Sequence, residues 1–131
     1  MGIEKDFLMR QLMLLFEVIH KIIGHRKKGE NKQALEAVQY FYECLKIEED
    51  IDKLSIEDLV VLLEKKKNLT KEQIELVAFV LKEQGEMQTE ESQRISLFQK
   101  AYFLLKKVEN ESAVFSMDRQ MKMEELKMYL N

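Results

Sequence analysis

The sequence contains no proline and no tryptophan, and only four of its 131 residues are glycine. Proline and glycine mark most turns, and a β-sandwich or β-barrel needs many turns. Their scarcity therefore argues against an all-β fold. Leucine, glutamate, lysine, glutamine and methionine are abundant instead, and these are good helix formers. We expect an all-α fold of five or six antiparallel helices.

Cysteine is almost absent as well, since Cys44 is the single one. No disulfide can form within the chain, and no cysteine cluster can bind zinc. This composition fits a reducing, cytoplasmic environment. Acidic residues interrupt the first residues where a signal peptide is basic, so we expect no secretion signal. The longest apolar stretch, 12–19, is interrupted by Glu17 and is far shorter than the ~20 residues that span a bilayer.

The net charge of −3 is unevenly distributed along the chain. Residues 1–28 contain six basic and three acidic side chains, whereas residues 29–131 contain fifteen basic and twenty-one acidic ones. An acidic chain of this kind is a poor binder of nucleic acid. We therefore expect no nucleic-acid partner.

The length fits one domain, and we expect a single helical domain over residues 1–131. Apolar residues recur at helical spacing, and Ser55 with Asp58 and Thr70 with Gln73 resemble capping boxes. We expect Gly85 to weaken the helix that Thr70 begins, and Ser112 to cap the last helix. The predicted helices are 4–26, 31–47, one beginning at Ser55, one beginning at Thr70, 90–108 and 112–130.

Two segments are similar to the helices of a tetratricopeptide repeat. Residues 29–40, Gly-Glu-Asn-Lys-Gln-Ala-Leu-Glu-Ala-Val-Gln-Tyr, resemble its turn and second helix, with Gly29 in the turn and Ala34 at the close approach. Residues 94–102, Arg-Ile-Ser-Leu-Phe-Gln-Lys-Ala-Tyr, resemble a second such helix, with Gly85 in the helix before it. The closing proline is missing, Arg94 stands where the repeat prefers alanine, and residues 48–69 do not fit a repeat.

More broadly, the chain resembles a family of small uncharacterised helical proteins of Gram-positive bacteria. The resemblance rests on residues 5–11, Lys-Asp-Phe-Leu-Met-Arg-Gln, on the turn 29–35, and on residues 54–59, Leu-Ser-Ile-Glu-Asp-Leu, followed by the helices with Gly85 and Ala101. It covers about residues 4–108 and leaves the tail 112–131 as particular to this chain. The resemblance implies a tetratricopeptide-like helical array and no specific activity.

The first predicted helix is apolar around most of its circumference. At 100° per residue, one apolar stripe has two apolar flanks, and a narrow polar strip interrupts them. The stripe holds Leu8, Leu12, Leu15, Ile19, Ile22 and Ile23; Phe7, Leu14 and Val18 lie on one flank, and Met9, Met13, Phe16 and His20 on the other; Asp6, Arg10, Glu17 and Lys21 form the polar strip. A surface helix normally has a narrower apolar stripe. Either this is the central helix of the domain, or one flank contacts a second protein chain.

The last predicted helix is rich in methionine, and Met117, Met121 and Met128 share one stripe. Methionine side chains adapt to irregular surfaces and are common in permissive binding grooves. The stripe either fills gaps in the core or serves as an adaptable contact with this domain or a partner.

No catalytic, cofactor or metal site is expected. His20 and His25 are five residues apart and diverge on a helix, and Cys44 has no evident base. The acidic cluster 48–52 lacks the glycine of a calcium loop and fits a solvated loop. No glycine-rich phosphate loop or nucleophile elbow is present.

These observations favour a non-catalytic protein–protein interaction module that self-associates through its first helix. The expected contact residues are Met9, Met13, Phe16, His20, Met117, Met121 and Met128. One alternative is peripheral membrane attachment through this helix with Lys27 and Lys28, which we consider less fitting because Glu17 lies between Arg10 and Lys21. Another is a small enzyme or metal protein without a recognisable motif.

Overall fold

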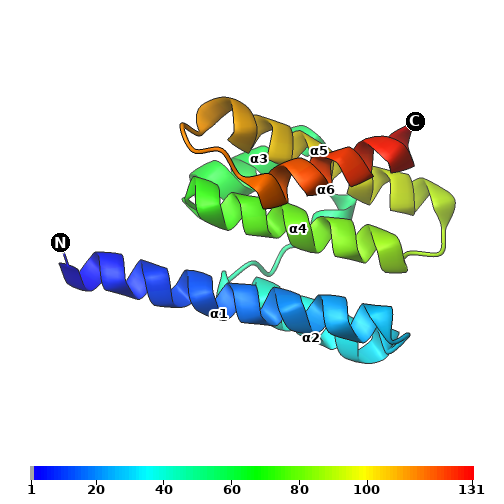
Figure 1. Cartoon of the computed structure of the whole chain (residues 1–131), viewed down its shortest axis with the longest axis horizontal. Helices are drawn as coiled ribbons and strands as arrows, with labels where there is room; N and C mark the ends of the chain where they lie inside the picture. The colour runs from blue at the N-terminus through cyan, green and yellow to red at the C-terminus, as the bar shows by residue number, and fades with distance from the viewer. Residues whose placement is uncertain (1) are drawn as a thin grey trace. The chain divides into compact units, whose positions relative to one another are not determined.

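The computed structural model describes residues 2–131, and over that range it is all-α, with no strand. Figure 1 shows the helices in chain order. The elements are α1 (Gly2–Lys27), α2 (Asn31–Cys44), the 3₁₀-helix η1 (Ile51–Lys53), α3 (Ile56–Val61), the π-helix η2 (Leu62–Lys66), α4 (Lys71–Met87), α5 (Glu91–Glu111) and α6 (Met117–Leu130). They form two compact units, one ending at Ile47 and the other comprising Glu48–Asn131.

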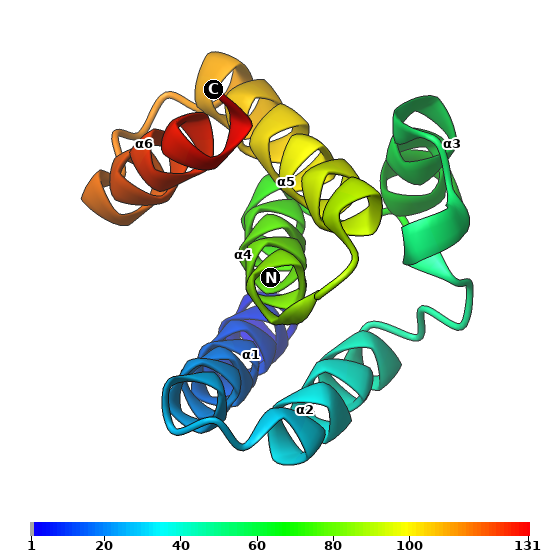
Figure 2. The same ribbon diagram turned by 90° about the vertical axis from the view of Figure 1, so that its right-hand side faces the viewer.

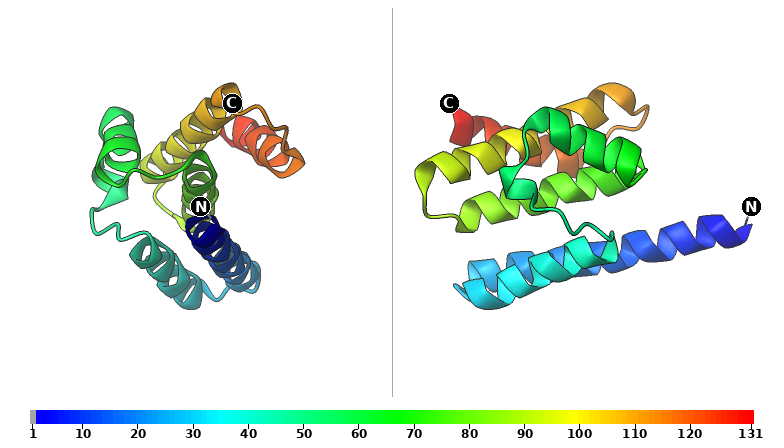
Figure 3. Two further views of the ribbon diagram at one scale, coloured as in Figure 1. Left: turned by 90° about the vertical axis from the view of Figure 1, so that its left-hand side faces the viewer. Right: turned by 180° about the vertical axis from the view of Figure 1, so that it is seen from behind.

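The first unit is an antiparallel pair of helices, α1 and α2. Gly29, with φ of +77°, ends α1 in a left-handed conformation that glycine adopts without strain. The amide of Glu30 donates to the carbonyl oxygen of His25 and that of Gly29 to Arg26, which is the Schellman arrangement. Because α1 has 26 residues and α2 has 14, the N-terminal part of α1 extends beyond the end of α2 (Figure 3).

The buried side chains of this unit come from one face of each helix. On α2 these are Ala34, Val38 and Phe41, and on α1 they are Leu15, Val18, Ile19 and Ile22. The side-chain amide of Gln11 donates to the carbonyl oxygen of Cys44, 3.5 Å away, where α2 ends. One face of α1 is therefore engaged along the helix from Gln11 to Ile22.

In the second unit, α5 lies between α6 and α3 and also packs along α4 (Figure 2). Ser55 caps α3 by accepting a hydrogen bond from the amide of Asp58. Thr70 and Gln73 form the expected reciprocal capping box at the start of α4. The helix α4 is buried around most of its circumference, from Gln73 to Gly85.

The all-α class is confirmed, and three local predictions are wrong. The second helix ends at Cys44 rather than at 47, because Lys46 adopts a left-handed φ of 58° and closes it without a glycine. Ser112 is the C-cap of α5, and Ser116 caps α6 instead. Gly85 does not weaken α4, which continues to Met87. The tetratricopeptide likeness stays a prediction.

Gly85 has a packing role. A Cβ at this position would lie 2.6 Å from Cε1 of the Phe98 ring. Phe98 is buried, and its ring stacks on that of Tyr129 with centroids 4.6 Å apart. The ring therefore has little room to move, and only glycine permits this approach of α4 to α5.

We expect Gly85→Ala to lower the free energy of unfolding by about 1–3 kcal/mol, because overpacking outweighs the gain in helix propensity. Gly24→Ala is the matched control within a helix, since no atom lies within 4 Å of its added Cβ. It should raise the free energy of unfolding by up to about 1 kcal/mol. Urea unfolding measures both, and a shift of the two midpoints in the same direction would contradict this role of Gly85.

Candidate functional site

The clearest candidate surface is a stripe of exposed side chains on α1, formed by Met9, Met13, Phe16 and His20. The exposed fractions of the first three are 56%, 63% and 44%, and His20 is exposed as well. The residues follow one another at steps of four, three and four. At 100° per residue they lie within about 60° of one another on the helix surface. We call these four residues the α1 stripe.

The α1 stripe lies on the other side of the helix from the buried residues Leu15, Val18 and Ile22. Within the first unit, α2 covers one face of α1 and leaves this flank exposed. The two interpretations of the flank, a central helix of the domain or a contact with a second chain, both stay predictions.

A row of alternating charges borders the α1 stripe. Asp6, Arg10, Glu17 and Lys21 are all exposed and lie next to it on the helix surface. Among residues 4–131, none of these four side chains belongs to an ion pair in the structure. The α1 stripe thus has an apolar centre and one charged border, which is the anatomy of an interaction surface.

The last helix, α6, is anchored to its own unit by a buried arginine. The guanidinium of Arg119 lies 2.6 Å from Glu75 Oε1 on α4 and 2.7 Å from Glu109 Oε1 on α5. It also donates to the carbonyl oxygen of Val114. Arg119, Met123 and Leu126 are the buried residues of α6, so this face is committed to the unit.

A second buried cation strengthens the same attachment. Lys82 Nζ lies 2.9 Å from Glu86 Oε2 and 2.8 Å from Glu125 Oε2, which belongs to α6. Burial alone would lower the pKa of Lys82, but the hydrogen bonds with Glu125 and Glu86 outweigh it and the pKa is raised. Tyr129 donates to Glu86, which raises the pKa of the tyrosine hydroxyl.

The methionines predicted as contact residues lie on the opposite face of α6. Met117, Met121 and Met128 are each more than half exposed. The interpretation that they fill gaps in the core is therefore wrong for all three. Met123 is the methionine of α6 that does so. The predicted residues of α1 and α6 belong to different units and make two separate surfaces.

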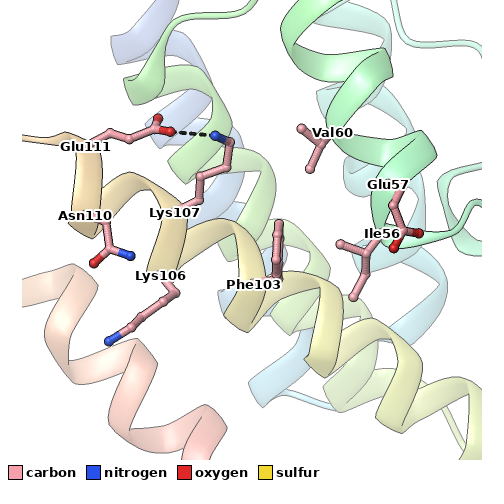
Figure 4. Close-up of a pocket in the computed structure, with 8 residues that line it drawn as sticks. All are labelled: Ile56, Glu57, Val60, Phe103, Lys106, Lys107, Asn110 and Glu111. Atoms are coloured by element: carbon pink, nitrogen blue, oxygen red, sulfur yellow. Dashed lines mark hydrogen bonds and ion pairs between the residues drawn. The ribbon is translucent and has the colours of Figure 1, made fainter.

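A third candidate is an open groove of about 540 Å³ between α3 and α5 (Figure 4). Phe103 lies at its centre, facing Ile56 and Val60, and the ion pair of Lys107 with Glu111 closes one end. Phe103 is exposed, whereas Ile56 and Val60 are half-buried. The groove thus offers one exposed aromatic ring. It has fewer exposed apolar side chains than the α1 stripe.

The other residues weighed from the sequence are dispersed. Nδ1 of His25 lies 2.8 Å from Glu30 Oε1 in the α1–α2 turn, so this histidine is half-buried and bound rather than exposed. Glu49 pairs with Lys67, and Cys44 is half-buried. Within residues 2–131, no group of three or more histidine, cysteine or acidic residues is arranged to hold a metal ion. No helix in that range is both long and apolar enough to cross a membrane.

No family model, no curated protein and no solved structure matches this chain.

Sequence reasoning missed the buried cations Arg119 and Lys82 and the groove around Phe103. The sequence does contain a signal for the burial of Arg119, because Arg119, Met123 and Leu126 recur at steps of four and three. This spacing places the three residues on one face of α6. The arginine at its start and the methionines of the other face concealed it.

We expect Arg119→Ala to lower the free energy of unfolding by about 3 kcal/mol, because it leaves the carboxylates of Glu75 and Glu109 without their buried cation. Lys127→Ala removes an exposed ion pair with Glu124 and should change the free energy of unfolding by about 0.5 kcal/mol at most. Thermal and urea unfolding measure both. Equal effects of the two variants would show that Arg119 does not anchor α6.

Proposed function

We propose that this protein is a non-catalytic protein–protein interaction module that self-associates through the α1 stripe. One observation carries the proposal: Met9, Met13, Phe16 and His20 are aligned and exposed on a helix whose opposite face is already buried. Single exposed apolar residues are ordinary on protein surfaces, but aligned ones bordered by charges are typical of contact sites.

The spacing of the α1 stripe fits a helix as its partner. Steps of four, three and four residues are those of the a and d positions in a coiled coil, where side chains of one helix insert between those of another. Phenylalanine and methionine are also enriched in the centre of protein interfaces. The α1 stripe therefore supports helix-to-helix association.

The exposed methionines of α6 provide a second surface of similar composition. Their bordering charges are engaged within the unit, since Asp118 pairs with Lys122 and Glu125 pairs with Lys82. On α1 the charges beside the stripe form no such pair among the described residues. This difference favours α1 as the contact between copies.

We expect the double variant Met13→Glu and Phe16→Glu to convert a dimer into a monomer, because four carboxylates would meet in the interface. Both side chains are exposed, so helicity should be retained. Sedimentation velocity over a micromolar concentration series measures association, and circular dichroism measures helicity.

The matched control is Met121→Glu, which adds the same charge at an exposed methionine of α6 and should leave the dimer intact. A wild-type chain that stays monomeric throughout the series would contradict self-association. Loss of the dimer in Met121→Glu alone would assign the contact to α6. Unfolding of the double variant would place Met13 and Phe16 in the core of the chain.

A further inference from the structure

We infer that the partner of the α1 stripe is the α1 helix of a second copy, in antiparallel orientation. This inference rests on the proposed self-association and specifies its geometry. It follows from the order of the charges beside the α1 stripe, which is acidic at Asp6, basic at Arg10, acidic at Glu17 and basic at Lys21.

This order becomes complementary when it is reversed. In an antiparallel pair, the two-fold axis stands perpendicular to both helices, so the charged borders of the two copies lie on the same side. Arg10 then lies level with Glu17 of the partner subunit, and Asp6 lies level with Lys21 of the partner subunit. Symmetry repeats both contacts, which makes four pairs of opposite charge.

The α1 stripe follows the same reversal. When Met13 lies level with Phe16 of the partner subunit, Met9 lies level with His20 of the partner subunit. The midpoint of the α1 stripe and the midpoint of the charged row differ by one residue, about 1.5 Å along the axis. Arginine and lysine side chains easily span the resulting offset, so one register satisfies both sets.

A parallel pair loses this match. Its two-fold axis runs along the helices, so the charged border of one copy faces the opposite border of the other. On that opposite border lie Lys5, Leu12 and Ile23. Lys5 is level with Asp6 of the other copy alone, so Arg10, Glu17 and Lys21 meet no opposite charge there. Exposed ion pairs contribute little to affinity, but unmatched or like charges select between orientations.

Cross-linking between copies tests the orientation. Met9→Cys and His20→Cys are made separately in a Cys44→Ser background and treated with a short bismaleimide. We expect a cross-linked dimer when the two variants are mixed and little from either alone. In an antiparallel pair, two copies of the same position are eleven residues apart along the axis, about 16 Å.

A parallel pair would give the opposite result, with cross-linking in each variant alone. That outcome, or a sedimenting dimer that forms none of these links, would overturn the orientation. A cysteine variant and wild type that both sediment as monomers would contradict the proposed function itself. Sedimentation of each sample before cross-linking keeps the two failures distinct.

Charge reversal provides a second test. Arg10→Glu places glutamate against the partner's Glu17, and Glu17→Arg places arginine against the partner's Arg10. Each variant alone should raise the dimer dissociation constant about fivefold or more. Mixing the two variants creates pairs of opposite charge in the mixed dimer and should restore association to near the wild-type value.

The mixture is its own control, because neighbours within each chain are the same in mixed and unmixed samples. Recovery on mixing therefore reports a contact between chains. Absence of recovery, with helicity unchanged by circular dichroism, would overturn the antiparallel pairing of Arg10 with Glu17 of the partner subunit.

Discussion

The distribution of apolar side chains around α1 is the physical constraint on which the proposed function depends. A helix can bury only the face that another element covers, and α1 carries apolar residues on more than one face. Leu15, Val18 and Ile22 are buried, whereas Met13 and Phe16 are exposed. Apolar side chains that are exposed and contiguous typically mark an interaction site.

The helix α6 shows how the same chain treats a helix that it does cover. Its inner face combines apolar packing by Met123 and Leu126 with the buried guanidinium of Arg119, which is bound by two carboxylates. A buried ion pair adds little net stability, but removing one partner is costly. Such pairs therefore fix which face of α6 points inward, and α1 has no comparable device at its stripe among the described residues.

The sequence predicts the helical class and most helix starts, because periodicity and capping are local. The capping box of Thr70 with Gln73 is predicted correctly. Ser112 and Ser116 are equivalent candidates for the N-cap of α6, because neither is followed three residues later by glutamate or glutamine. The end of α2 at Cys44 is hidden because Lys46 adopts the left-handed conformation without being glycine. The exposure of Met117 and the burial of Arg119 depend on which elements meet, and periodicity alone does not define this.

Affinity and orientation can come from different residues of one surface. Phe16 and the methionines offer apolar area. Its burial favours association but is non-directional, so it hardly distinguishes a parallel from an antiparallel pair. The charges beside them interact at longer range, and these interactions are weak in water. The order of the charges along α1 nevertheless differs between the two directions of the helix, so it can select an orientation. A surface that combines the two can associate through apolar contact and still select one orientation. The alternation from Asp6 to Lys21 is for this reason more informative about the orientation of the proposed assembly than the hydrophobicity of the α1 stripe beside it.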